Sequence, residues 1–217
     1  KAQPVLKSFE TRLLEREVQI LTDIDIVYKK KALYNVKTEY LVSGFGAVEV
    51  SSELTMPKNS KAPNEIPRFG LVLQLKKEFD KVKYFGRGER ENLPDMKAHA
   101  PVGIYETTVE AMHEPYIYPQ DNGERTEVKW LSITDEQGRG IKVYANDKFA
   151  FNAHNYTVNA LYEAQHQEDL KEQPTTVLTL DGAIRGTGTA SCGPDTLPEY
   201  VIDASEGLAF SFTILPL

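Results

Sequence analysis

The stretch EPYIYPQDNGERTEVKW, residues 114–130, combines two prolines, two tyrosines, an Asn-Gly dipeptide and the only tryptophan of the chain. Asn122-Gly123 predicts a type I′ turn, because both central residues of that turn need a positive φ angle and these two tolerate it best. From Arg125 to Lys129 every second residue is charged, which is the period of a strand with one exposed face. The residues between them, up to Trp130, are then expected on the buried face. The stretch therefore predicts an extended arm, a turn and a core strand.

The composition is that of a globular chain with an acidic surface. Its 217 residues are 41% apolar, enough to bury a sizeable core. The net charge of −7 argues against a nucleic-acid partner, which would require a basic face. Because no run of about eighteen apolar residues occurs, no membrane span is predicted. The single cysteine excludes an internal disulfide bond and leaves cytoplasmic and periplasmic locations both open.

Alternation of apolar and polar residues predicts antiparallel β-strands along most of the chain. Leu6 to Arg16 also fits a short helix, but the alternation that begins at Glu17 favours strands. Ser43-Gly44-Phe45-Gly46 predicts a hairpin loop, and residues 135–138 predict another. The expected strands are residues 17–29, 33–43, 46–56, 69–75, 81–86, 128–134, 140–145, 175–180 and 207–215.

Irregular segments separate these strands. Residues 57–67 contain three prolines and predict a polar loop, since proline cannot donate to a strand ladder. Residues 87–116 predict a long irregular crossover with one short helix around Val109, and residues 157–166 predict a second short helix. No repeat or linker divides the chain, so residues 1–217 are expected to form a single domain. The pattern predicts an all-β fold, a large antiparallel two-sheet β-sandwich with at most one or two short helices.

The histidines show no metal-binding pattern. His99, His113, His154 and His166 lack metal-ligand spacing with one another and with Cys192. No metal site is therefore predicted.

Two glycine-rich segments predict turns and not nucleotide-binding loops. Gly86-Arg87-Gly88 and Gly186-Thr187-Gly188 both lack the third glycine of a dinucleotide-binding motif and the helix that follows it. Ser191 and Cys192 are candidate nucleophiles beside the second segment, but there is no G-x-S-x-G elbow and no histidine close in sequence. Neither residue is assigned a catalytic role.

Four motifs follow one another in an order and spacing similar to those of a known family. Pro115 to Trp130 fits the pattern P-Y-x-x-P-x-x-N-G-x-R-T-x-V-x-W, and Gly86 to Asp95 fits G-x-G-x-x-E-N-x-P-D. Leu180-Asp181-Gly182 resembles a hydrophobic-Asp-Gly turn, and residues 186–194 resemble a late glycine-rich loop. From about Ile66 to the last residue the chain thus resembles the C-terminal small-chain domain, domain 5, of glycoside hydrolase family 2 β-galactosidases. The resemblance implies a supersandwich fold similar to that of galactose mutarotase.

The resemblance also implies a role in β-galactosidase activity, the hydrolysis of terminal non-reducing β-D-galactose residues, and in lactose catabolism. In the resembled enzymes two catalytic glutamates lie in a TIM-barrel domain, roughly 5 Å apart, and this chain shows no sign of that barrel. Asn64-Glu65 does match the Asn-Glu dipeptide of an acid/base site, but it lies in the proline-rich loop. No catalytic residue is expected in this chain, which should be inactive alone.

The glycine-rich loop is the part that the resemblance places near the substrate. Gly186, Gly188, Ser191, Cys192 and Gly193 are expected to form one wall of the sugar pocket. Some family members carry tryptophan at the position of Cys192, so a cysteine there predicts weaker aromatic stacking and a roomier subsite. The alternative is a buried structural cysteine.

The segment that begins at Glu91 departs from the family pattern E-N-Y-P-D-R. Leu93 and Met96 replace its tyrosine and arginine, so a hydroxyl group and a bidentate cation are lost. These replacements call into question the family's polar network around Asp95.

The implied partners are the remaining domains of the same β-galactosidase, a β-galactoside substrate and further copies in a homo-oligomer. No cofactor is implied within this chain, whereas the barrel of the full enzyme can carry a divalent or monovalent cation. Because Lys1 is no natural start, the chain is expected to be a fragment that lacks the first strands of the domain. Two other interpretations stay open. One is a free-standing carbohydrate-binding sandwich, with Tyr116, Tyr118 or Trp130 on a concave face, and the other is a purely structural sandwich.

Overall fold

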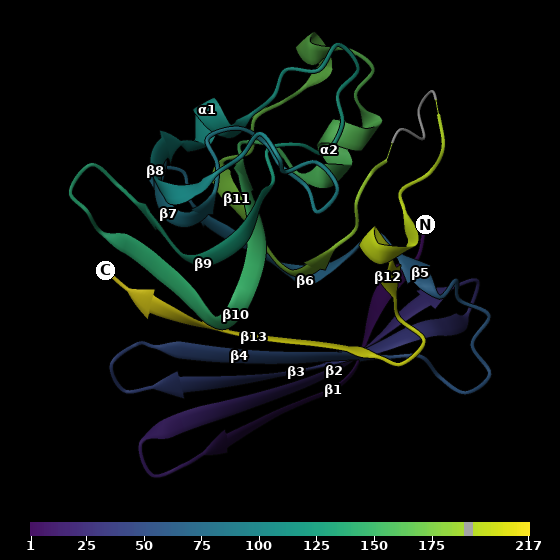
Figure 1. Ribbon diagram of the computed structural model, residues 1–217. Helices are drawn as coiled ribbons and strands as arrows, with labels where there is room; N and C mark the ends of the chain where they lie inside the picture. Colours follow the sequence, from purple (N-terminus) through teal and green to yellow (C-terminus); the bar gives the residue numbers. More distant parts are fainter. Residues whose placement is uncertain (189–192) are drawn as a thin grey trace.

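Long antiparallel strands dominate the computed structural model, which describes residues 1–188 and 193–217. Figure 1 shows these strands in two layers that face each other. The first layer has the order β1-β2-β3-β4-β13, and β2, β3 and β4 form the meander that the alternating pattern predicts. No strand was predicted at β1, where part of the segment also fitted a short helix, but it pairs with β2 from Gln3 to Leu13. Its strands are β1 (Gln3–Leu13), β2 (Glu17–Tyr28), β3 (Lys31–Ser43), β4 (Val48–Thr55) and β13 (Leu208–Pro216).

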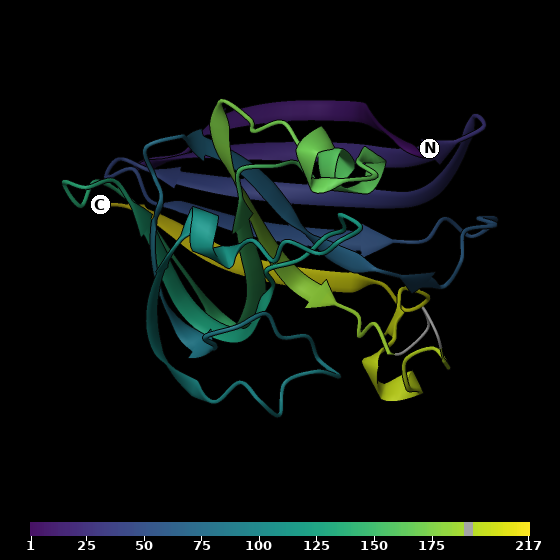
Figure 2. The ribbon, with the colours of Figure 1, turned by 90° about the horizontal axis from the view of Figure 1, so that it is seen from above.

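The second layer is built on β10 (Gly140–His154), which also pairs with the first layer. Ile141 to Tyr144 of β10 pair with β13, whereas Ala150 to His154 pair with β11. Figure 2 shows the strands of the second layer crossing over those of the first. The two-sheet antiparallel sandwich is therefore confirmed, with β10 joining its layers. The second layer further contains β6 (Arg68–Lys76), β7 (Lys81–Arg87), β8 (Val102–Thr108), β9 (Arg125–Thr134) and β11 (Thr175–Ile184), and a separate small sheet contains β5 (Glu65–Ile66) and β12 (Ile202–Asp203).

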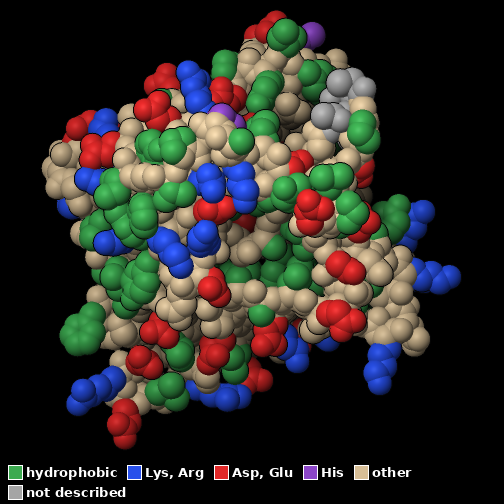
Figure 3. Space-filling view, in the orientation of Figure 1, with side chains coloured by type: hydrophobic (Ala, Val, Ile, Leu, Met, Phe, Trp, Pro, Cys, Tyr) green, Lys and Arg blue, Asp and Glu red, His purple; other side chains and the backbone are tan. Residues whose placement is uncertain are grey.

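The main core lies between the two layers. Val50 and Phe212 reach it from the first layer, and Leu131 and Leu178 reach it from the second, each no more than 4% exposed. Burying such a side chain stabilises the fold by roughly 1.5–3 kcal/mol. In β4, residues 50, 52 and 54 point inward while their neighbours are exposed or half-buried, which is the predicted period of two. Charged side chains of both signs are interspersed on the face that Figure 3 shows.

Two short α-helices cross the ends of the second layer, where the sequence predicts them. In α1 (Val109–Met112) the Thr108 side chain accepts a hydrogen bond from the Ala111 amide, 3.1 Å away. Thr157 caps α2 (Val158–Glu163) in the same way. Single 3-10 turns cover Gln167–Asp169 and Pro198–Tyr200. Among the described residues, no helix has the length and apolar character needed to span a membrane.

One predicted loop is a strand in the structure. Residues 87–116 were expected to be irregular, yet β8 lies within them and pairs with β7 along its whole length. Two apolar residues of β8 point outward, since Val102 is 50% exposed and Ile104 is 62% exposed, whereas Tyr105 packs against the main core. Because apolar residues lie on both faces of β8, the sequence pattern does not indicate a strand.

The alternation in β9 also differs from the prediction. Arg125 is only 2% exposed, although a charged residue there was expected on the solvent face. Glu127 has a φ of 54°, and the pairing with β10 shifts register nearby, so the period of two is interrupted. Trp130 is consequently half-buried outside the core, with the Lys142 ammonium 5.0 Å above its ring.

The Asn-Gly dipeptide before β9 does not form a hairpin turn of type I′. Gly123 has a positive φ of 78°, but Asn122 does not, and no strand precedes the pair. The Asn122 side chain is used instead to hold the incoming loop, since its Oδ1 accepts a hydrogen bond from the Glu114 amide at 2.9 Å.

Candidate functional site

A cavity of about 530 Å³ lies where three segments that are distant in sequence come together. Residues 91–96 form one side of it, residues 116–124 form the second, and residues 184–188 with Asp195 form the third. Pro67 and Arg68, at the start of β6, complete the lining. All four motifs that the sequence analysis singled out therefore lie at or next to one cavity.

The Asp95 carboxylate ties the glycine-rich segment to the cavity. It accepts hydrogen bonds from the amides of Thr187 (3.2 Å) and Gly188 (2.6 Å) and from the Thr196 hydroxyl (3.0 Å). Burial opposes ionisation of Asp95, but these hydrogen bonds outweigh burial and hold its pKa below the usual value. The polar network around Asp95 is therefore present, although Leu93 and Met96 replace the residues of the family pattern.

Two glycines make this attachment sterically feasible. A Cβ atom on Gly186 would lie 2.4 Å from the Asp95 carboxyl carbon, so only glycine allows the carboxylate to approach. Gly188 has a φ of +58°, and a Cβ atom there would lie 2.5 Å from the Thr196 amide nitrogen. Both residues line the cavity.

The other predicted members of the pocket loop are less well defined. Ser191 and Cys192 lie outside the described residues. Gly193 is exposed and does not line the cavity. Of the five residues predicted to form the pocket loop, only Gly186 and Gly188 are described residues that line the cavity.

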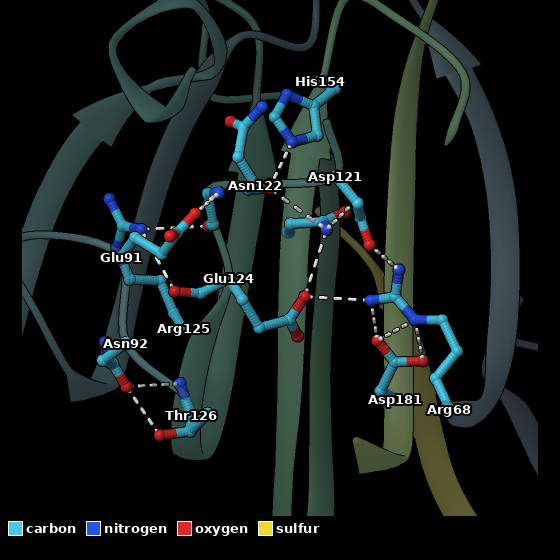
Figure 4. A network of polar contacts seen from close by, with 12 residues as sticks. Arg68, Glu91, Asn92, Asp121, Asn122, Glu124, Arg125, Thr126, His154 and Asp181 are labelled. Carbon is cyan, nitrogen blue, oxygen red and sulfur yellow. Dashed lines mark hydrogen bonds and ion pairs between the residues drawn. The ribbon is translucent and has the colours of Figure 1, made fainter. Parts of the chain in front are cut away.

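A charged cluster that the sequence does not predict also lies at this cavity (Figure 4). The Arg68 guanidinium donates through Nη1 to Asp121 at 2.6 Å and through Nη2 to Glu124 at 2.9 Å. Its Nε and Nη2 atoms also bind both carboxylate oxygens of Asp181. Asn152 Nδ2 donates to Glu124 Oε2 at 3.1 Å. One guanidinium therefore faces three carboxyl groups.

Asp181 lies within β11 and not in a turn, contrary to the predicted hydrophobic-Asp-Gly turn. It pairs with Gly70 of β6 and Ala150 of β10, and the register shift falls at the next residue, Gly182. A Cβ atom on Gly182 would lie 2.3 Å from the Phe210 Cβ atom. The Asp-Gly pair thus forms a β-bulge that packs against the first layer and turns Asp181 toward Arg68.

The cluster has too few positive charges for its carboxyl groups. Burial and the nearby Asp181 carboxylate raise the pKa of Glu124 well above its usual value, despite the Arg68 guanidinium. Burial likewise raises the pKa of Asp181 to about 6. Oε1 of Glu124 has no hydrogen-bond donor among the described residues. The Glu124 carboxyl group therefore keeps its proton to a higher pH than an exposed glutamate does.

Replacing Glu124 with glutamine is expected to raise the free energy of unfolding at pH 8 by about 1–3 kcal/mol. A carboxyl group whose folded pKa is raised stabilises the fold at low pH, and that stability is lost as pH rises from the unfolded pKa through the folded one. For Asp181 the loss falls between about pH 4 and 6, and for Glu124 it extends higher. Urea denaturation of both proteins at pH 5 and pH 8 measures the difference.

Other titrating groups do not obscure this comparison. Glu127, whose pKa is lowered to about 2 chiefly by the hydrogen bond from Lys97, is ionised at both pH values. Burial lowers the pKa of His154, but that group is identical in the two proteins. A glutamine variant that is equally stable relative to the parent at pH 5 and pH 8 would contradict the prediction.

A second polar network holds residues 116–123 at the same cavity. Glu91 accepts from the Tyr116 hydroxyl at 2.7 Å and from the Gly123 amide at 2.5 Å. His154 Nε2 lies 2.6 Å from the Asn122 carbonyl oxygen. The buried Arg125 guanidinium donates to Gly123 O and to the Tyr84 hydroxyl. Tyr116 thereby acquires a fixed orientation on the cavity wall.

The remaining predicted site residues are dispersed. Tyr118 is 62% exposed and Trp130 lies on β9, and neither lines the cavity with Tyr116. His113 and His154 approach to 5.9 Å between ring centroids, which their sequence spacing does not predict. In the part of the chain that the structure describes, no group of three or more His, Cys, Asp or Glu residues could hold a metal ion.

Comparisons with known proteins agree on one family. The family model described as "Beta galactosidase small chain" matches residues 3–214. A beta-galactosidase from Actinobacillus pleuropneumoniae is 35% identical over 162 residues, which cover 75% of this chain and 16% of that protein. A beta-galactosidase from Staphylococcus xylosus is 32% identical over 202 residues, which cover 92% of this chain and 20% of that protein. The chain thus spans a fifth or less of the length of these relatives.

One solved structure supports the fold. The GalM/aldose epimerase homologue from C. elegans superimposes with a TM-score of 0.50 at 9% sequence identity, covering 97% of this chain and 69% of that one. At this identity the similarity concerns the fold alone. It agrees with the supersandwich that the sequence motifs imply.

Proposed function

Because the chain belongs to the beta-galactosidase small chain family, we propose that it is part of a family 2 β-galactosidase that hydrolyses terminal non-reducing β-D-galactose residues, as in lactose. The chemistry would take place on a barrel domain elsewhere in the polypeptide, and this chain would be inactive alone. It would contribute one wall of the sugar pocket through the glycine-rich segment. The catalytic carboxylates, and any cation that the barrel carries, would belong to that other domain.

The observation that carries this proposal is the attachment of the glycine-rich segment to Asp95. Gly188 and Thr196 lie on either side of the segment that contains Ser191 and Cys192, and both bind the same carboxylate. Because two positions flanking this segment are fixed to one carboxylate, the segment would lose little further entropy on meeting a neighbouring domain. This is the property that a pocket wall needs.

The carboxyl groups that bind Arg68 do not form a glycosidase pair. Glu124 and Asp181 are at most 3% exposed, and both bind the same arginine. A retaining enzyme needs two carboxyl groups on either side of an open substrate site. The arrangement therefore supports a structural use of these acids and a catalytic centre located elsewhere.

The test is hydrolysis of a chromogenic β-galactoside. The chain alone is expected to show no activity, and a mixture with a polypeptide that supplies the remaining domains is expected to be active. Deletion of residues 186–194 should weaken the activity of the mixture. Hydrolysis by the chain alone would show that a catalytic pair lies within it and would overturn the proposal.

Replacing Asp95 with alanine is expected to lower kcat/KM of the mixture by about 10- to 100-fold, because a displaced pocket wall misplaces the substrate. Asp203→Ala is the matched control, since Asp203 also accepts a loop amide (Ser205 N, 2.8 Å), but one outside the glycine-rich segment. The steady-state rates of both variants decide the question. Equal effects of the two replacements would count against a specific role for Asp95.

A further inference from the structure

The acidic end of the cavity carries more negative charge than its own residues neutralise. Four carboxyl groups gather there, those of Glu91, Asp121, Glu124 and Asp181, and Arg68 is the basic residue that binds three of them. Glu91 forms no ion pair with any described residue, since its two oxygens accept from a hydroxyl and an amide. Arg185 and Asp195, which also line the cavity, form an ion pair with each other at 3.0 Å, so their charges cancel.

The Glu124 side chain provides a second, independent observation. It lines the cavity, is 4% exposed, and uses only one of its two oxygens, Oε2, for hydrogen bonds to Arg68 and Asn152. The other oxygen, Oε1, is buried and has no donor among the described residues. Leaving such a group unmatched is costly, because a buried charge needs both a counter-charge and hydrogen bonds. The site lacks one cationic donor.

The shape of the cavity indicates what kind of cation fits. Leu93, Met96 and Ile184 give it apolar walls, and the Tyr116 ring adds a flat one. Apolar walls that lead to an acidic end suit a side chain with an aliphatic stem and a charged head. A guanidinium or ammonium head could donate several hydrogen bonds to carboxylates at once. A neutral sugar would satisfy hydrogen bonds but leave the charge imbalance in place.

We propose that this cavity is a docking socket for a basic side chain, arginine or lysine, presented by another domain of the assembled protein. Relatives five times as long as this chain supply ample polypeptide to carry such a residue. The inference deepens the proposed function and rests on it for the existence of a neighbouring domain. The socket holds the base of the glycine-rich segment and the neighbouring domain together, and the sugar pocket lies beyond it.

Docking of the cation competes with the proton on Glu124. Asp121 and Asp181 face the same guanidinium, Arg68, and Asn152 contributes a neutral amide. Burial keeps the Glu124 carboxyl group protonated at low pH, so an arriving cation must displace that proton. Binding should therefore tighten as pH rises.

The chain itself contains a reporter for the test. It has three methionines, of which Met96 lines the cavity and is 41% exposed, Met112 is fully buried in the main core, and Met56 packs against the smaller core cluster. In the 217-residue chain with ¹³C-labelled methionine methyl groups, N-propylguanidinium at pH 8 is expected to shift the Met96 resonance saturably and to leave the other two unchanged. The neutral N-propylurea and sodium chloride at equal ionic strength should leave Met96 unchanged.

Substitutions at the cluster, measured at two pH values, test whether the cation binds at Glu124. Glu124→Gln is expected to weaken N-propylguanidinium binding at least about 10-fold at pH 8, and to reduce the pH dependence between pH 5 and pH 8 to the part that Asp181 contributes. Asp121→Asn, at a more exposed position, serves if the first variant does not fold. Glu106→Gln is the matched control, because Glu106 is an exposed acid on β8 that does not line this cavity.

Several results would overturn the proposal. A Met96 resonance that ignores the guanidinium, or that responds equally to the urea, excludes a cation socket. An affinity for N-propylguanidinium that is unchanged in the Glu124→Gln variant also excludes a cation socket. A response to galactose without a response to the guanidinium would make the cavity a sugar site instead. Because no arm of this test measures hydrolysis, loss of the Met96 response with an active mixture refutes only the socket, and the reverse refutes only the proposed function.

Discussion

Replacing Arg68 with leucine is expected to lower the free energy of unfolding by about 3–5 kcal/mol at pH 7, the largest effect that we anticipate for a single side chain. The replacement leaves Asp121, Glu124 and Asp181 without the one guanidinium that binds all three. Removing one partner of a buried ionic cluster costs more than the cluster contributes, because the remaining charges stay desolvated.

The decrease in the free energy of unfolding caused by Arg68→Leu should be smaller at low pH. Near pH 4.5 the carboxyl groups of Glu124 and Asp181, whose pKa values burial raises, are largely protonated and need the guanidinium less. Arg12→Leu is the control, since Arg12 forms an exposed ion pair with Glu10 and its loss should change stability by less than about 0.5 kcal/mol. Urea denaturation at both pH values tests the prediction, and an equal loss at pH 4.5 and pH 7 would contradict it.

Replacing Asn92 with alanine is expected to cost about 2–4 kcal/mol, the second largest effect. Its side chain is completely buried and makes four hydrogen bonds. The Nδ2 atom donates to the carbonyl groups of Arg87 and Arg90, and Oδ1 accepts from both the amide and the hydroxyl of Thr126. Alanine cannot replace any of these, so several buried polar groups lose their partners at once.

Asn92→Asp separates the two halves of this network. It keeps an acceptor for Thr126 but has no N–H to donate, and it also places a charge in a buried position. Asn146→Ala is the control, because Asn146 is exposed on β10 and should tolerate the change within about 0.5 kcal/mol. Thermal or urea denaturation of the three variants gives the ranking. An Asn92→Ala protein as stable as the control would show that the network contributes little.

The sequence predicts most of the strands because their signal is local. The predicted strands β2, β3 and β4 are confirmed, although burial alternates clearly only in β4, and the Ser43 to Gly46 loop joins β3 and β4 as expected. The error at β8 arises from the outward position of Val102 and Ile104. No local pattern distinguishes an apolar residue that faces the core from one that faces solvent on a strand at the end of a sheet.

The candidate site is predictable only in part, for a different reason. Gly186 and Gly188 could be selected because a glycine-rich motif lies within a few residues of sequence. Arg68 and Asp181 could not, since they are far apart in the chain and meet only through the pairing of β6 with β11. Arg125 was expected on the surface because a charge usually is, whereas Tyr84 and backbone carbonyl groups satisfy it in the interior.

The position of β13 bears on how the chain is made. This strand pairs with β4 on one side and β10 on the other, and Leu54 meets Leu208 although they are about 150 positions apart. During synthesis on the ribosome the β1–β4 meander can fold first, but the free edge of β4 stays open until β13 has been synthesised. An open edge of this kind is prone to wrong pairing between nascent chains. The interval between the synthesis of β4 and that of β13 is therefore expected to influence the yield of correctly folded protein.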